Sequence, residues 1–323
     1  MIGNPTDMYG GSVISCSTKE RAECILDNVS PGNVVSLEVS GDRQQLHSTS
    51  DLALRGDKLD IARAVLIALD VDPATAHPFV LHARTNIPMH AGLAGSTAIL
   101  ASITGAVLSH LGLRLNQYEI AELVRKIEYD VMRTVCGFQD HYMAVFGGLN
   151  YMDFRGKFSS AVAGPQSPFA TIEPLQHLTD IPPLVLAHTG VQRHSGTVHS
   201  SIRDRWLRGD ADVVEAYERI AVLARAGKKA LLACDWDAFA ALMNENHILQ
   251  RDLGGSSESN ERLITAALDS GAVGAKLAGA GGGGTIIALS EDPQRLVAGL
   301  LAAGADAILY PMPSPGLTIE IPV

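Results

Sequence analysis

The stretch "HAGLAGSTAIL", residues 90–100, places two glycines and a Ser-Thr pair directly before a long apolar run. Apolar residues then recur at helical spacing as far as Leu111, and Gly112 ends the pattern. A glycine-rich loop that leads into a helix presents backbone N–H groups and the positive end of the helix dipole to one point, which suits a phosphate. A plain helix start capped by Ser96 or Thr97 explains the same letters without a ligand. This stretch alone leaves both interpretations open.

The composition indicates a soluble globular protein with room for two domains, because the 323 residues are 46% hydrophobic and 19% charged. The formal net charge is -10 and Lys and Arg form no dense cluster, which disfavours nucleic acid as a partner. The four cysteines lack the spacing of a zinc site or a disulfide scaffold, so we expect the reducing cytoplasm.

The segment from Thr85 to Leu113 carries no charged residue and is long enough to raise the question of a membrane span. It also contains glycines, a proline and two histidines, which fit a buried loop and helix better. No basic-then-apolar signal segment precedes the fold, so we expect an untargeted protein with no membrane partner.

Runs of strand-like and runs of helix-like sequence predict an α+β fold rather than regular alternation. The strands expected from alternation or β-rich composition lie after Gly11, at 33–40 and 79–88, at the end of the stretch 136–154, and at 182–190, 285–289 and 317–323. The helices expected from apolar periodicity lie at 58–70, after residue 95, at 116–132 with Asn116 as its cap, and as two or three helices over 213–250. The polar segment at 155–174 predicts a domain boundary, which we place between domains 1–165 and 166–323.

The run "GAGGGG", residues 279–284, formally matches the dinucleotide fingerprint G-x-G-x-x-G. That fingerprint needs a strand before the glycines and a helix after them, whereas here residues 271–284 are expected to form a loop and the strand-like "TIIAL" follows. No Gly-Lys-Ser/Thr indicates a Walker A loop. What remains is a backbone segment that approaches a ligand closely, with a tight structural turn as the alternative.

Two further stretches carry charged residues suited to chemistry. In "CGFQDHY", residues 136–142, Asp140 follows a helix that carries Glu128, and two such acids can divide metal binding and base catalysis. Each acid alone is better explained as a surface carboxylate or a helix cap. "RHSGTVHSSIRDRW", residues 193–206, gathers arginines that fit an anionic ligand or a basic helix face paired with acids.

Three of these stretches together resemble the motifs of the GHMP small-molecule kinase family. "GNPTDMYGG" at 3–11 resembles the first motif of its sugar-kinase branch, "IPMHAGLAGSTAI" at 87–99 its phosphate loop, and "KLAGAGGGG" at 276–284 its third motif. The resemblance implies an N-terminal domain like domain 2 of ribosomal protein S5, a C-terminal helical and sheet domain, and an active site between them. Residues 90–100 would then hold the phosphates of ATP without a Walker lysine.

Carried over position by position, the resemblance also implies roles for individual residues. Asp140 would be the catalytic acid that orients or deprotonates the attacking hydroxyl, and Ser96 and Glu128 would bind Mg²⁺. The ATP phosphates would contact Ala91, Gly92, Leu93, Ala94, Gly95, Ser96 and Thr97. The sugar would contact Asp7, Gly10, Gly11, Asp140, Arg193, Gly279, Gly281 and Gly282, with Arg193 or a neighbour meeting a carboxylate.

Within the family, three stretches resemble the glucuronokinases: "RHSGTVHSSIRDRWLRGD" at 193–210, "TNIPMHAGLAGSTAI" at 85–99 and the Gly-Phe-Gln-Asp segment at 137–140. This resemblance implies ATP- and Mg²⁺-dependent phosphorylation of the anomeric hydroxyl of D-glucuronate. "GFQDHY" and "FGGLN" are shared with heptose 7-phosphate kinases, which are the alternative together with other sugar 1-kinases. In the sugar kinases an arginine precedes the first motif at a position upstream of Met1, which motivates a second alternative, a non-catalytic nucleotide- or sugar-binding regulator. The expected partners are ATP and a small sugar or sugar acid, and a homodimer is compatible with the sequence.

Overall fold

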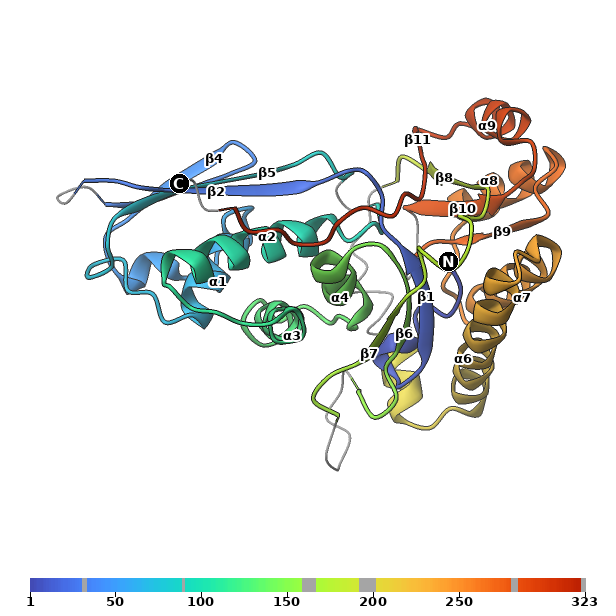
Figure 1. The fold of residues 1–323 in the computed structure, drawn as a ribbon, viewed down its shortest axis with the longest axis horizontal. Coiled ribbons are helices and arrows are strands. Elements are labelled where there is room, and N and C mark those ends of the chain that lie inside the picture. Colours follow the sequence, from blue (N-terminus) through green and yellow to red (C-terminus); the bar gives the residue numbers. More distant parts are fainter. Residues whose placement is uncertain (31–33, 89–90, 159–166, 192–201, 280–283, 321–323) are drawn as a thin grey trace.

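The computed structural model describes residues 1–30, 34–88, 91–158, 167–191, 202–279 and 284–320 (Figure 1). Its strands are β1 (Ser12–Cys16), β2 (Ala22–Asn28), β3 (Val35–Val39), β4 (Asp42–Leu46), β5 (Phe79–Thr85), β6 (Leu149–Asp153), β7 (Thr171–Pro174), β8 (Leu184–His188), β9 (Gly274–Leu277), β10 (Thr285–Leu289) and β11 (Ala307–Leu309). Its α-helices are α1 (Asp60–Ala68), α2 (Gly95–His110), α3 (Gln117–Lys126), α4 (Gln139–Phe146), α6 (Ala211–Leu232), α7 (Trp236–Asp252), α8 (Glu258–Asp269) and α9 (Pro293–Ala302). Short turns of helix occur at η1 (Thr6–Met8), η2 (Thr49–Leu52) and the π-helical η3 (Ile127–Val131), and residues 202–207 are also helical.

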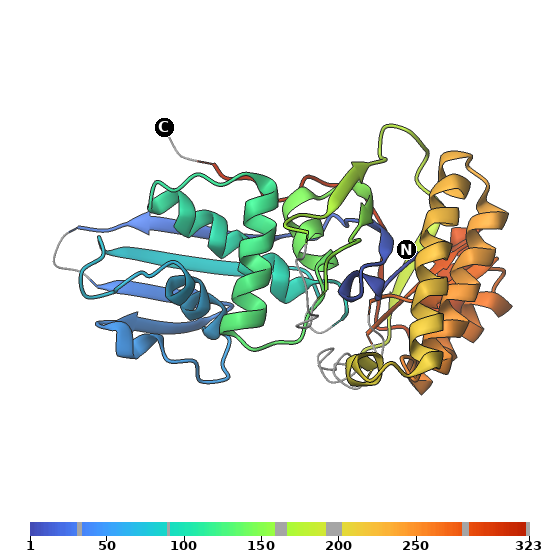
Figure 2. The ribbon, with the colours of Figure 1, turned by 90° about the horizontal axis from the view of Figure 1, so that it is seen from below.

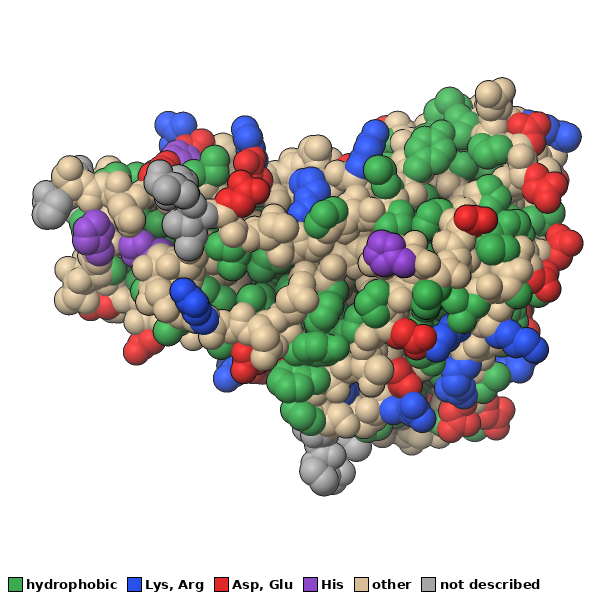
Figure 3. Space-filling view, in the orientation of Figure 1, with side chains coloured by type: hydrophobic (Ala, Val, Ile, Leu, Met, Phe, Trp, Pro, Cys, Tyr) green, Lys and Arg blue, Asp and Glu red, His purple; other side chains and the backbone are tan. Residues whose placement is uncertain are grey.

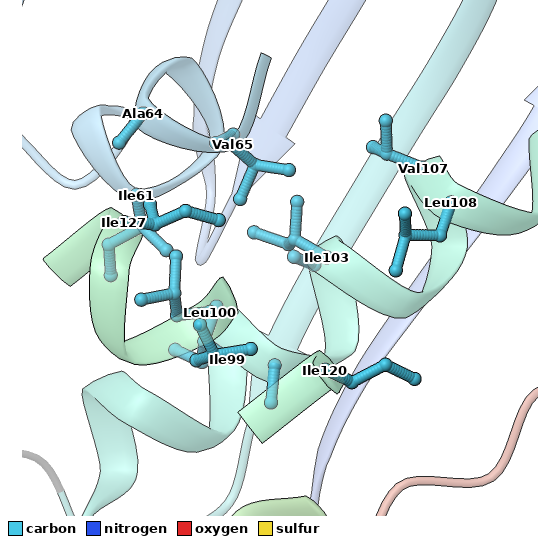
Figure 4. Packing of buried hydrophobic residues seen from close by; sticks show 14 of the residues in the cluster. Ile61, Ala64, Val65, Ile99, Leu100, Ile103, Val107, Leu108, Ile120 and Ile127 are labelled. Atoms are coloured by element: carbon cyan, nitrogen blue, oxygen red, sulfur yellow. The ribbon is translucent and has the colours of Figure 1, made fainter. Parts of the chain in front are cut away.

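The first layer of the molecule is a four-stranded sheet in the order β2-β5-β3-β4. Residues on β3 alternate between buried and partly exposed positions, as expected for a sheet that buries one face. The helices α1, α2 and α3 lie on that buried side (Figure 1). Aliphatic side chains of α1, α2, α3 and η3 interdigitate there (Figure 4), so the core fixes the axis of α2 and thereby the loop that precedes it.

A second, smaller sheet lies in the middle of the molecule in the order β1-β6-β7, and β1 pairs with β6 from Ser12 opposite Asp153 to Cys16 opposite Leu149. The third sheet has the antiparallel order β11-β8-β10-β9. Alternate residues of β8 and β10 enter two different cores, one with α8 and α9 and the other with α6, α7 and β1. Helices α6 and α7 lie side by side on one face of this sheet, at one end of the molecule (Figure 2). The α+β prediction is therefore confirmed.

Two segments of the predicted C-terminal domain, β7 and residues 311–317, pack against the N-terminal half of the chain. Strand β7 pairs with β6 although the predicted boundary at 165/166 separates them, and residues 311–317 return to the N-terminal half. There the Met312 N–H donates to the Ser17 carbonyl at 2.7 Å and the Leu317 N–H donates to the Val145 carbonyl at 3.1 Å. The division into 1–165 and 166–323 stays a prediction.

Three local predictions were wrong. Neither Ser96 nor Thr97 caps α2, because the helix begins at Gly95 behind Ala94, whose φ of 56° is left-handed. A strand precedes the glycine run as well as following it, since β9 pairs with β10. Residues 317–320 form no strand, because Leu317 packs its side chain over α2 instead of joining a sheet edge.

Two predictions about helix ends were confirmed. Asn116 caps α3 by accepting the Glu119 N–H at 3.1 Å, and Gly112 follows α2 with a φ of 66°. None of the four cysteines forms a disulfide. Across the described ranges, no helix combines the length and the apolar character that a bilayer crossing needs. On the face drawn in Figure 3, Lys and Arg side chains are interspersed with Asp and Glu, so this face has no continuous basic surface.

Candidate active site

A large cleft of about 2150 Å³ brings the separated motifs together. Its lining includes Asp7 from the first motif, Glu128 from η3, Asp140 from α4 and Gly279 from the third motif. All seven residues from Ala91 to Thr97 also line it. The cleft is therefore where the residues singled out by the sequence meet.

The loop before α2 leaves backbone N–H groups for a ligand. Gly92 and Ala94 both have positive φ, which turns the chain sharply into the helix. Ala94 occupies the N-cap position and has no side-chain oxygen, so it cannot accept the first N–H groups of α2. Those groups and the helix dipole face the cleft, which is the arrangement that binds phosphate.

Glu128 is held in place by two side chains. Its Oε2 accepts from the Thr97 hydroxyl at 3.1 Å and lies 2.8 Å from Nε2 of His141. Burial alone would raise the pKa of Glu128, but the hydrogen bond and the charge of His141 outweigh burial and lower that pKa. Burial likewise opposes protonation of His141, yet Cys136 and Glu128 beside the ring raise its pKa to about 10. Glu128 is thus an ionised carboxylate at the edge of the cleft.

Asp7 fastens the first motif to the start of α4. Its Oδ2 accepts the N–H groups of Phe138 at 2.7 Å and Gln139 at 2.9 Å. A carboxylate at a helix N-terminus is favoured by both the free N–H groups and the helix dipole. This clamp fixes the helical turn that carries Asp140.

Asp140 opens onto the cleft and has an unusual pKa. Desolvation by the surrounding protein raises its pKa to about 6, the positive charge of His141 opposes this rise, and the negative charges of Asp7 and Glu128 add to it. Asp7, Glu128 and Asp140 thus line the same cleft as the loop from Ala91 to Thr97, and carboxylates that share a cleft favour a bound cation.

A buried polar network joins the first motif to the third. Asn4 donates from Nδ2 to the Gly279 carbonyl at 2.6 Å and accepts from Nζ of Lys276 at 3.0 Å. From α7, Asn246 accepts the Gly3 N–H at 2.8 Å. Gln250 Nε2 donates to the Gly279 carbonyl at 3.3 Å. Burial lowers the pKa of Lys276 to about 7. The start of the glycine run is therefore positioned from two sides.

Some predicted residues lie elsewhere. Gly10 and Gly11 are not among the residues that line the cleft, and a Cβ on Gly11 would lie 2.1 Å from the Thr6 hydroxyl, so that glycine serves a tight turn. Arg193, Gly281 and Gly282 lie outside the described residues. Their binding roles stay predictions.

The sequence analysis did not identify the residues that hold the predicted site residues in place. His141 and Glu128 are 13 residues apart and lie on different helices, so no local sequence pattern predicts their contact. Asn246 and Gln250 did leave a signal, because they are polar residues at i and i+4 on the buried face of α7.

Comparison with known proteins identifies the family. The model of the GHMP kinases N terminal domain matches residues 60–148, and that of GHMP kinases C terminal matches residues 228–306. Mevalonate kinase from Pyrococcus horikoshii is 31% identical over 99% of this chain and 95% of its own length. The chain is a GHMP kinase. It is accordingly a phosphotransferase with an alcohol acceptor, and ATP is the phosphate donor of its family.

Other GHMP kinases similar to this one differ in their acceptors. Glucuronokinase 1 from Arabidopsis thaliana is 28% identical over 91% of this chain and 84% of its own length. A solved structure described as a D-glycero-D-manno-heptose 1-phosphate kinase from Bacteroides thetaiotaomicron superposes with a TM-score of 0.72 and 21% identity, covering 99% of this chain and 96% of that one. The latter likeness confirms the GHMP kinase fold.

Proposed function

We propose that this GHMP kinase transfers the γ-phosphate of ATP to the anomeric hydroxyl of a sugar acid, D-glucuronate, giving D-glucuronate 1-phosphate and ADP. The observation that carries the proposal is the place of Asp140, at the start of α4 in the same cleft as the 91–97 loop and Glu128. The glucuronate assignment is supported by the motif resemblance and by the name of the Arabidopsis relative.

The phosphate donor and a metal ion have suitable partners. The loop from Ala91 to Thr97 offers backbone N–H groups to the phosphates of ATP. Ser96 and Glu128 would hold Mg²⁺, because a hydroxyl and an ionised carboxylate are the hard oxygen ligands that this ion prefers. Bound Mg²⁺ would neutralise charge on the β- and γ-phosphates.

Asp140 would accept the proton of the attacking hydroxyl. The O1–H proton of the sugar moves to the carboxylate as O1 bonds to the γ-phosphorus and the bond to the ADP oxygen breaks. A pKa of about 6 leaves Asp140 ionised at neutral pH and makes it a stronger base than an ordinary aspartate. Positioning and charge neutralisation supply the rest of the acceleration.

The acceptor pocket would be formed by residues around Asp140. Asp7 and Gly279 line the cleft beside it, so we propose that they contact the sugar. Arg193 remains the proposed partner of the sugar carboxylate. The described arginines of the same stretch have acidic partners of their own, since Arg203 pairs with Asp204 and Arg205 with Asp212.

A heptose phosphate is the second candidate acceptor, because "GFQDHY" and "FGGLN" resemble that branch and the Bacteroides structure shares the fold. The non-catalytic alternative loses its support, since the chain belongs to a kinase family. One hydroxyl or carboxylate on the acceptor changes specificity through a few contacts only, so the two candidates are separated by turnover.

The test is ADP release by the purified protein with Mg-ATP and a panel of D-glucuronate, D-galacturonate, D-galactose, L-arabinose and a heptose 7-phosphate. We expect turnover selective for D-glucuronate that is lost in Asp140→Asn and kept in Asp130→Asn, which changes an exposed aspartate on η3. Turnover with the heptose 7-phosphate alone would identify a heptose phosphate, the second candidate, as the acceptor substrate. Near wild-type turnover in Asp140→Asn would remove the catalytic role of that residue.

The carboxylate contact has its own test. Arg193→Ala should raise the KM for D-glucuronate while leaving the KM for ATP unchanged. An unchanged KM for D-glucuronate would rule out Arg193 as the carboxylate partner.

A further inference from the structure

A second set of metal-binding side chains adjoins the proposed Mg²⁺ site. Glu128, Cys136 and His141 each offer one ligand atom, and these atoms all lie within 4.8 Å of one another. Carboxylate, thiol and imidazole form a donor set that a purely oxygen-binding cation does not use. The proposed Mg²⁺ chemistry leaves Cys136 and His141 without a metal-binding role.

His141 connects the other two donors of the cluster. Its side chain is only 1% exposed, and its ring is hydrogen-bonded to both Glu128 and Cys136. The three donor groups are therefore already in mutual contact, and a cation that replaces the protons held between them can meet all three.

A cation in the cleft can reach the cluster, and the segment that carries Cys136 can shift to close around it. All three residues line the cleft. Cys136 lies in the segment 133–137, which has no regular secondary structure, whereas Glu128 and His141 are held by helices. In a tetrahedral site with bonds of roughly 2.0–2.3 Å, ligand atoms are about 3.3–3.6 Å apart. Adjustments of the order of 1 Å would therefore close the cluster around an ion.

We propose that Glu128, Cys136 and His141 bind a thiophilic divalent cation of the Zn²⁺ class, with the fourth position open to the cleft. Three protein ligands and one open position are a common Zn²⁺ arrangement, and the bound ion deprotonates its thiol ligand. Because Glu128 is also a proposed Mg²⁺ ligand, the two ions exclude each other. Zn²⁺ is thus an inhibitor of the kinase, and this consequence, unlike the binding itself, rests on the proposed function.

Binding is tested on the metal-free full-length protein with Co²⁺ as a spectroscopic probe and Zn²⁺ as its competitor. We expect a cobalt–thiolate charge-transfer band in the wild type and in Cys234→Ala, an exposed cysteine between α6 and α7. The band is absent in Cys136→Ala and in Cys136→Ser, and the affinity for Zn²⁺ falls at least about tenfold in both. Two substitutions keep the test valid if one of them fails to fold.

A band that persists in either folded Cys136 variant, or that is missing from the wild type, would overturn the proposal. Inhibition is measured separately, with each variant's rate divided by its own rate in Mg²⁺ alone. The Zn²⁺ concentration for half inhibition should rise at least about tenfold in the Cys136 variants, and it should rise with Mg²⁺ in the wild type. Binding without inhibition would leave the cation site standing and would contradict the proposed role of Glu128 in holding Mg²⁺.

Discussion

Replacing Gly137 by alanine should break the clamp that holds α4. A Cβ built on Gly137 lies 1.9 Å from Oδ2 and 2.7 Å from Cγ of Asp7. Both contacts are shorter than any that a real methyl group makes, so the Asp7 carboxylate must withdraw. It then loses the N–H groups of Phe138 and Gln139, both of which donate to that same oxygen.

The size of the effect follows from those two hydrogen bonds. A hydrogen bond to a charged group contributes about 1.5–3 kcal/mol, so their loss lowers the free energy of unfolding by at least about 3 kcal/mol. Gly137 does not have a positive φ, so an alanine there adds no backbone strain. With Asp7 already replaced, Gly137→Ala should be neutral or stabilising by about 0.4–1 kcal/mol through the unfolded chain.

The assay is a double-mutant cycle of Gly137→Ala and Asp7→Ala, with urea unfolding followed by circular dichroism and ADP release measured on each protein. We expect Gly137→Ala to lower the free energy of unfolding by at least about 3 kcal/mol when Asp7 is present and by almost nothing when Asp7 is replaced. Turnover should fall in both single variants, because each releases the turn that carries Asp140. An equal cost in both backgrounds would refute the clamp.

Three further outcomes follow from the site. Asp140→Asn should lower kcat by at least about 100-fold and yet raise Tm at pH 7.5, since the folded protein no longer holds an ionised carboxylate whose pKa is about 6. The wild type is destabilised by the ionisation of Asp140 as pH rises from the ordinary aspartate pKa through 6, so the difference in Tm between Asp140→Asn and the wild type should vanish below about pH 4. A difference in Tm that does not change with pH would contradict the raised pKa of Asp140. Thr97→Val removes one donor to Glu128, and we expect a loss of about 1.5 kcal/mol in urea unfolding and a higher Mg²⁺ requirement in the kinase assay. Gln250→Leu removes one hydrogen-bond donor to the Gly279 carbonyl, and we expect a raised KM for one of the two substrates when both are varied. Unchanged KM values would contradict a role of Gln250 in positioning the glycine run.

Features encoded by neighbouring residues could be predicted from the sequence. The Asn116 cap and the Gly112 ending depend on side chains and φ angles within one turn of the helix. The cap of α2 escaped prediction because Ala94, not Ser96, occupies it in a left-handed conformation that tertiary packing imposes on an ordinary residue. A Ser-Thr pair at a helix start is therefore not sufficient to locate the cap.

The centre of the site was predictable because its motifs are contiguous, while the support of each residue comes from distant segments. Asp7 was predicted as a sugar contact, and the structure adds that it accepts two N–H groups more than 130 positions along the chain. Lys276 precedes the glycine run in sequence but lies fully buried against Asn4. Such pairings depend on the closure of the whole fold, which no local periodicity encodes.

The return of residues 311–317 to the N-terminal half affects the order in which the protein can be completed. This segment leaves the ribosome after almost everything that it contacts, yet Ser314 accepts the Gly148 N–H at 2.8 Å and Arg21 donates to the Gly316 carbonyl at 2.8 Å. Until it emerges, those groups on the first-made half have only water as a partner, and the apolar surface of α2 around Gly105 lacks its Leu317 cover. The nascent N-terminal half therefore lacks these contacts while the C-terminal helical half is translated, and during that time chaperones can bind it and proteases can cleave it.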